Sequence, residues 1–215
     1  MSLEELRKRI DEVDSQLVEL LNKRVNIALE IAELKKRNDL RIFSPEREDL
    51  VLKKVVEKNP GPLPDENLEN IYREIISSTR SMERLLKVCY LGPAGTFTHQ
   101  AARQRFGSAV EFEAVADIES VFEAVSRGEA DCGVVPVENS TGGVVIETLD
   151  TFMKYDVKVC GEVTLEIHHN LLAKCQMSEI RTVYSKPDAL NQCRSWLVAN
   201  LPISWMSAVE PVPRP

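Results

Sequence analysis

The sequence of 215 residues lacks long hydrophobic runs and a surplus of positive charge. No apolar run approaches the ~20 residues that a membrane-spanning helix needs, and the acidic beginning does not resemble a signal peptide. The formal net charge is −7, and no basic stripe with interleaved aromatic residues occurs. We therefore expect a cytoplasmic protein without a membrane or nucleic-acid partner.

Cysteine is present, but it lacks the spacing of a metal site or a disulfide framework. The five cysteines are widely separated and form no Cys-x-x-Cys motif. Buried thiols in a reducing compartment fit this pattern better than disulfides or zinc ligands. We expect neither a metal nor an organic cofactor.

One long amphipathic helix is expected at the beginning of the sequence. Apolar residues recur in steps of three and four from Leu3 to Leu34. Ser2 and Glu5 have the spacing of a capping box, and residues 38–39, Asn-Asp, supply a stop signal. At 1.5 Å per residue the helix is about 50 Å long, which is more than a small monomeric core covers. This length predicts an intertwined dimer.

Two shorter helices follow the long one. The second begins at Ser44-Pro45 and ends before the turn at residues 59–62, Asn-Pro-Gly-Pro. The third follows Pro64-Asp65. Its apolar side is expected at Leu68, Tyr72, Ile75, Thr79, Met82 and Leu86. Residues 1–87 are therefore expected to form an all-α domain of three helices.

A positive charge interrupts the apolar stripe of the first helix. Arg24 lies between Leu20 and Ile27, at a place where the spacing calls for an apolar side chain. Lys35 is only about 20° away around the helix, whereas Arg7 is rotated by about 100°, toward a neighbouring chain. Arg24 either sets the register of a coiled coil or joins other cations that bind an anionic substrate.

The pattern changes near residues 84–88 to the strand-helix alternation of a parallel sheet. Strands are expected at 88–91, 110–115, 132–137, 157–163 and 182–184. Helices are expected at 98–106, 118–127, 143–154 and 187–200. This predicts an α/β domain over residues 88–200. The segment 201–215 holds four prolines without clear periodicity and is expected to be irregular.

Two loops in the α/β part follow strand ends and precede helices. The loop at 92–98 is a glycine-rich turn whose free N–H groups suit an anion, although glycine turns that only cap a helix are commoner. The loop at 138–143 is a run of polar and glycine residues. In an open parallel sheet both loops lie at the same edge, where ligands bind.

The helical part carries several motifs that together identify a family. They are Leu6-Arg7-x-x-Ile10-Asp11-x-x-Asp14, Arg24, Lys35, Pro45-Glu46-Arg47-Glu48 and the run from Ile71 to Ser77. With them, residues 3–87 resemble the AroQ-type chorismate mutases. The resemblance implies a homodimer in which Arg24 and Arg47 bind the carboxylates of chorismate together with Arg7 of the partner subunit.

The same resemblance implies roles for four further residues. Lys35 would donate to the ether oxygen of chorismate, Glu48 would accept the ring hydroxyl, and Thr79 stands where the family usually has serine. Glu83 occupies a position that is glutamine in some members. Because a carboxyl group donates a hydrogen bond only when protonated, we predict that mutase activity rises toward acidic pH.

Motifs of a second family follow in the α/β part. They are Gly92-Pro-x-Gly-Thr-Phe97 and Gly133-Val-Val-Pro-Val-Glu-Asn-Ser-Thr-x-Gly143, with shorter matches at 148–150, 161–163, 167–172 and 185–193. These motifs are similar to those of the prephenate dehydratases, which implies a periplasmic-binding-protein-like α/β domain. The order of the two parts is that of the bifunctional P-proteins of phenylalanine biosynthesis.

The second resemblance implies a cleft that binds prephenate. We place Thr96, Asn139, Ser140 and Thr141 in this cleft, with His169 as a further binding residue. Of the adjacent pair His168 and His169, one is expected to be structural, because neighbours on a strand point to opposite faces.

The resemblance to the dehydratases fades after Trp196. The Thr-Arg-Phe motif of the family, the strands that complete its cleft and its C-terminal ACT regulatory domain have no counterpart, and residues 201–215 match nothing in it. We expect an intact mutase beside an incomplete dehydratase with little or no activity. The alternatives are a mutase with a vestigial α/β part and a non-catalytic dimeric sensor of an aromatic acid.

Overall fold

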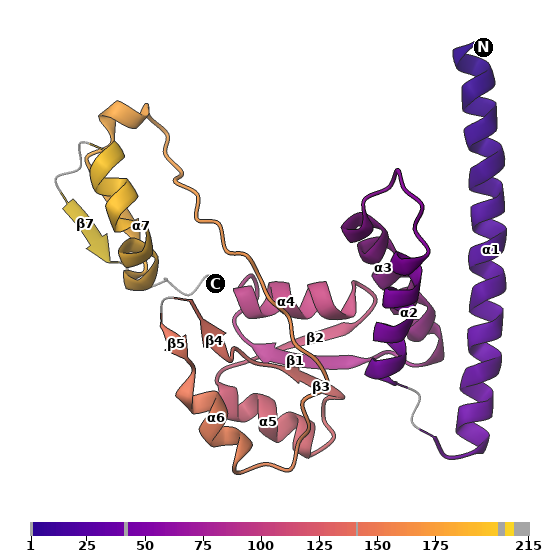
Figure 1. Ribbon diagram of the computed structural model, residues 1–215. Coiled ribbons are helices and arrows are strands. Elements are labelled where there is room, and N and C mark those ends of the chain that lie inside the picture. Colours follow the sequence, from indigo (N-terminus) through magenta and orange to yellow (C-terminus); the bar gives the residue numbers. More distant parts are fainter. Residues whose placement is uncertain (1, 41–42, 141, 202–204, 209–215) are drawn as a thin grey trace. The chain divides into compact units, whose positions relative to one another are not determined.

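The computed structural model describes residues 2–40, 43–140, 142–201 and 205–208 (Figure 1). The chain forms two compact units, Met1–Thr164 and Leu165–Pro215. The boundary expected at residue 87 falls inside the first unit. Within the described ranges, no helix combines the length and the apolar character needed to cross a membrane.

Helix α1, Leu3–Arg37, begins and ends where the sequence predicts. The Glu5 N–H donates to the Ser2 Oγ at 3.2 Å and the Ser2 N–H donates to a Glu5 carboxylate oxygen at 2.6 Å, which completes the capping box. Ala32 is the one buried residue of the helix, whereas Leu20 is 61% exposed. The described residues of a single chain therefore leave the apolar stripe of α1 uncovered.

Helices α2, Pro45–Glu57, and α3, Asp65–Glu83, also begin where the sequence predicts. The buried side of α3 agrees with the expected one at Thr79 and differs from it at Met82. Ile76 and Arg80 are buried, whereas Met82 is 61% exposed. The expectation was wrong at Met82 because α3 packs against α2 and α4 as well as α1, so a different row of its surface is covered.

The first unit contains a parallel sheet of three strands in the order β2-β1-β3. These are β1, Lys87–Leu91, β2, Glu111–Val115, and β3, Cys132–Val134. Val88 lies opposite Phe112 on one side and pairs with β3 on the other. A helical part is thus followed by an α/β part with a parallel sheet, as the sequence predicts.

Helices α4, Phe97–Phe106, and α5, Ile118–Ser126, cover opposite faces of this sheet (Figure 1). Successive side chains of β1 point to opposite faces, as pleating requires. Val88 belongs to a core cluster with residues of α4, and Cys89 belongs to a separate cluster with residues of α5. The central strand β1 is buried on both sides and holds the loops that follow it in place.

The chain after β3 departs from the expected pattern. Strands β4, Glu138–Asn139, and β5, Gly143–Val144, form a small antiparallel hairpin before α6, Ile146–Phe152. Residues 157–163, expected to be a strand, have no regular structure. That expectation was wrong because a strand needs a partner, and the described sheet of this unit ends at β3.

The second unit contains a single 3-10 turn, Met177–Glu179, followed by β6, Thr182–Ser185, and α7, Pro187–Asn200. Strand β7, Trp205–Ala208, pairs in parallel with β6. The segment 201–215 was expected to be irregular, and this is wrong for the four residues of β7. The free backbone groups along the edge of β6 explain the pairing.

Candidate functional site

The charge at Arg24 in the apolar stripe has a specific partner on the third helix. Arg24 is half-buried, and its Nη1 donates a hydrogen bond to the Thr79 Oγ1 at 2.9 Å. The Thr79 hydroxyl donates to the Ile75 carbonyl oxygen at 2.7 Å, so its lone pairs remain for the guanidinium. A neutral hydroxyl fixes the arginine without cancelling its charge, which leaves that charge for an anion.

Glu83 lies at the C-terminal end of α3 among charges from three helices. Its pKa is raised from the ordinary value of 4.5, chiefly because burial disfavours the carboxylate. The nearby charges that act on this pKa are Lys35, Lys36 and Arg80, which lower it, and Glu48, which raises it. The structure therefore brings Lys35, Glu48 and Glu83 together from α1, α2 and α3.

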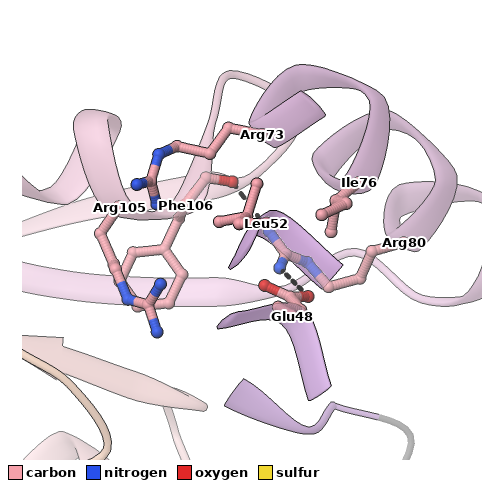
Figure 2. A pocket seen from close by; sticks show the side chains of 7 residues that line it. All are labelled: Glu48, Leu52, Arg73, Ile76, Arg80, Arg105 and Phe106. Carbon is pink, nitrogen blue, oxygen red and sulfur yellow. Dashed lines mark hydrogen bonds and ion pairs between the residues drawn. The ribbon is translucent and has the colours of Figure 1, made fainter. Parts of the chain in front are cut away.

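Glu48, in the first turn of α2, is held by an arginine that the sequence motifs did not single out. Its Oε1 accepts a hydrogen bond from the Arg80 Nη1 at 2.6 Å, and Arg80 is only 6% exposed (Figure 2). Removing either partner would leave a charge without compensation in a largely buried place. Arg80 lies four residues after the buried Ile76, on the same side of α3, and the periodicity of the sequence alone does not mark this row as buried.

Within one chain, the side chains of Arg47 and Arg7 do not contact the group formed by Lys35, Glu48 and Glu83. Both are exposed, and neither side chain forms an ion pair or hydrogen bond with another described residue. Arg7 and Arg24 lie on the same straight helix, about 25 Å apart along its axis at 1.5 Å per residue. One small molecule cannot touch both arginines of the same chain.

Thr96 follows β1 and caps helix α4. Its Oγ1 accepts a hydrogen bond from the His99 N–H at 3.3 Å and donates to the Leu91 carbonyl oxygen at 3.3 Å. The Gly95 N–H donates to the His99 Nδ1 at 3.1 Å. The hydroxyl placed in a ligand cleft by the sequence therefore shapes the loop as a helix cap.

The second loop begins after β3, the parallel neighbour of β1, so both loops lie at the carboxyl edge of the sheet. Asn139 lies in β4 and is exposed, and its Oδ1 accepts a hydrogen bond from the Gly142 N–H at 3.4 Å. Ser140 is exposed as well. Thr141 lies outside the described residues. The chemistry at this edge is that of amide, hydroxyl and backbone N–H groups.

His169 belongs to the second unit, where it is exposed and its Nε2 is hydrogen-bonded to the Gln192 Oε1 at 2.7 Å. His168 lies 3.5 Å from the carboxylate of Glu166. These histidines do not lie on a strand, so the argument that they point to opposite faces does not apply. In the part of the chain that the structure describes, no group of three His, Cys, Asp or Glu side chains could hold a metal ion.

Comparisons with known families divide the chain at the end of α3. The family model of type II chorismate mutases matches residues 6–84, and the model of prephenate dehydratases matches residues 88–210. The second match extends into the segment 201–215, for which the sequence motifs indicated no counterpart in the family.

Curated relatives join the same two parts in one chain. A protein of Aquifex aeolicus (strain VF5) is 46% identical over 97% of this chain and 59% of its own length. One of Stutzerimonas stutzeri is 44% identical over 93% of this chain and 57% of its own length. Both are described as bifunctional chorismate mutase/prephenate dehydratases, and the chain spans less than two thirds of either.

A solved chorismate mutase from Thermus thermophilus is 32% identical over 36% of this chain and 96% of its own, with a TM-score of 0.35. The two family models account for both parts, and relatives unite them in the same order. The chain belongs to the prephenate dehydratase family, whose model covers more than half of it, and its helical part matches the type II chorismate mutases.

Proposed function

We propose that residues 1–87 convert chorismate to prephenate at a site built from two chains. The reaction is a unimolecular pericyclic rearrangement, which needs no nucleophile and no base. It needs a folded substrate conformation and donors that stabilise charge on the oxygen of the breaking C–O bond. The observation that carries the proposal is the convergence of side chains from three helices. They are Arg24, Lys35, Glu48, Thr79 and Glu83.

Cations hold the two carboxylates of the substrate. Arg24 binds one of them, supported by its half-buried position and its neutral partner Thr79. Arg47, beside Glu48 on α2, and Arg7 of the partner subunit supply the remaining contacts. The contribution of Arg7 must come from a second chain because it lies about 25 Å from Arg24 along one helix.

Polar groups act on the reacting oxygen and on the ring. Lys35 donates to the ether oxygen and stabilises the negative charge that develops there. Glu83 donates to the same oxygen in its protonated form, which its raised pKa favours. Glu48 accepts the ring hydroxyl with a carboxylate oxygen while Arg80 holds it. Together these contacts select the conformation in which the rearrangement takes place.

A second copy of the chain covers the apolar stripe of α1. The stripe includes Ile10, Leu17 and Leu20, which are 60%, 51% and 61% exposed. An apolar surface that runs along ~50 Å of helix is far larger than monomers usually expose. Two antiparallel α1 helices related by a two-fold axis between Ser15 and Gln16 would bring Arg7 of one chain level with Arg24 of the other. The dimer and the complete site therefore form together.

The α/β part takes prephenate, the product of the mutase step, as its ligand. The Thr96 loop and the loop of Asn139, Ser140 and Thr141 follow neighbouring strands at one sheet edge, where N–H and hydroxyl groups suit carboxylates. His169, which belongs to the second unit, remains a prediction of the sequence. Dehydration would also require a proton donor for the departing hydroxyl. A cytoplasmic location remains a prediction of the sequence.

The test follows chorismate and phenylpyruvate in parallel with the purified chain. We expect chorismate to disappear with formation of prephenate, and Arg24→Met to lower kcat/KM by roughly 100-fold because a charged hydrogen bond to the substrate is lost. Lys23→Met, on the exposed neighbour, is the matched control and should keep the activity. Binding of an aromatic acid without loss of chorismate would contradict the proposal and favour a sensor. Phenylpyruvate production measures the dehydratase part separately.

A further inference from the structure

Arg80 connects the carboxylate of Glu48 with the α/β part of the chain. Its Nη1 donates to the Glu48 Oε1 at 2.6 Å, and its Nη2 donates to the carbonyl oxygen of Phe106, the last residue of α4, at 2.8 Å (Figure 2). The ring of Phe43 covers the guanidinium at 5.3 Å from the ring centroid. One buried guanidinium therefore spans a mutase helix and a helix of the α/β part.

The residues after α4 are fixed along α3 by close contacts. Gly107 has φ +76°, and a Cβ atom there would lie 2.5 Å from the Ser77 Cβ. The Ser108 N–H and Oγ donate to a Glu74 carboxylate oxygen at 3.1 and 2.6 Å. The Ala109 N–H donates to the Ser77 Oγ at 3.1 Å. These bonds hold the C-terminal end of α4 at a defined place on α3.

We propose that Arg80 is a positioning residue for the mutase reaction and that the α/β part, through the Phe106 carbonyl, holds Arg80 in the orientation that aims Glu48. The inference rests on the proposed role of Glu48 as acceptor of the ring hydroxyl. A guanidinium suits this task because its planar fork donates in fixed directions to two acceptors at once, whereas a lysine offers a single point charge.

Helix α4 connects the candidate prephenate loop with Arg80 of the mutase part. Its N-terminal end is capped by Thr96 in the candidate prephenate loop, and its C-terminal end holds Arg80. A displacement of α4 reaches both places. The mutase site is therefore sensitive to substitutions in the α/β part that touch no mutase residue.

The first test compares two arginines of the same interface in the full chain. Arg80→Met removes the contact with Glu48, whereas Arg105→Met removes an ion pair from α4 to Asp49 of α2, with bonds of 2.6 and 3.1 Å. We expect Arg80→Met to lower kcat roughly 10- to 100-fold with a smaller change in KM, and Arg105→Met to stay within about twofold. Equal losses in the two variants would overturn the inference.

The pH profile separates positioning from a general loss of structure. The charges that lower the pKa of Glu83 are Lys35 and Lys36 from α1 and Arg80 from α3, while Glu48 from α2 raises it. Arg80→Met should therefore move the decline of kcat/KM to higher pH. Arg80→Lys keeps the charge and should lower kcat without moving the decline. Partial unfolding would reduce the amplitude only.

The second test acts from the α/β part. Gly107→Ala places a methyl group against Ser77, whereas Gly128→Ala, at φ +72°, meets no atom within 4 Å. Both positions have a positive φ, so each variant strains the backbone, but only Gly107→Ala also meets a neighbouring side chain, and it should lower mutase kcat by roughly threefold to tenfold. Equal activity in both would contradict the coupling.

The outcomes separate this inference from the proposed function. A wild-type chain that leaves chorismate unchanged would refute the proposed function. An active wild type whose Arg80 and Arg105 variants behave alike would refute only the role of Arg80. Thermal unfolding of each variant confirms that it is folded. If Arg80→Met does not fold, Arg80→Lys and Gly107→Ala decide the question.

Discussion

The pH dependence of the mutase reaction should be set by Glu83. Replacing Glu83 with glutamine keeps the size of the side chain and supplies an amide that donates a hydrogen bond at every pH. The wild-type carboxyl donates only when protonated, and burial raises its pKa above 4.5 against the lowering effect of Lys35, Lys36 and Arg80. A bound dianion would raise the pKa further, because it adds negative charge nearby.

The expected size of the effect follows from the protonated fraction. Above the pKa of Glu83 this fraction falls about tenfold per pH unit, so the wild-type kcat/KM should fall with the same slope. The Glu83→Gln variant should show a level profile and should exceed the wild type at the alkaline end. The sign follows from the need for a protonated carboxyl: activity is present at low pH and is lost as the pH rises through the pKa of Glu83, which burial raises.

The assay measures kcat/KM for chorismate between about pH 5 and about pH 8 at constant ionic strength. Glu66→Gln, at an exposed position in the first turn of α3, serves as the matched control and should keep the wild-type profile. A level wild-type profile, or a glutamine variant with an unchanged slope, would refute the role assigned to Glu83.

Three further predictions concern other parts of the chain. Thr79→Val should raise KM roughly tenfold because Arg24 loses its hydrogen-bond partner, whereas Thr79→Ser keeps the hydroxyl and should keep the wild-type KM; steady-state kinetics measure both. Leu17→Glu, which places a charge on the exposed stripe of α1, should yield monomers in analytical ultracentrifugation, and a dimer of unchanged stability would argue against the proposed interface. Thr96→Ala should lower the free energy of unfolding by about 1 kcal/mol in urea titrations through loss of the α4 cap, while Thr96→Ser should retain it.

Local sequence signals predict the elements of the fold whose stability depends on neighbours in the chain. The capping box at Ser2 and the proline at position 45 locate the starts of α1 and α2, and the apolar runs locate β1 and β2. The expected strand at 157–163 and the irregular segment that contains β7 were wrong, because strands depend on partners that the local sequence does not reveal.

In the candidate site, too, local sequence predicts some residues, and others depend on contacts with distant parts of the chain. Helical geometry alone puts Arg24 and Lys35 on one side of α1, and the structure places both near α3. Arg80 could not be predicted in this way, because its place depends on the carbonyl oxygen of Phe106, which the fold of the α/β part supplies. Helical periodicity in the sequence therefore does not predict contacts between distant parts of the chain.

A complementation experiment tests most directly whether the site is shared between two chains. Arg7→Met and Arg24→Met should each abolish most of the mutase activity, and each variant should still fold and dimerise. When the two variants are unfolded together and refolded at equal concentrations, half of the dimers should be mixed, and each mixed dimer should hold one intact site and one doubly altered site. The account predicts recovery of about one quarter of the wild-type activity. No recovery above that of the separate variants would show that Arg7 and Arg24 do not meet across the dimer.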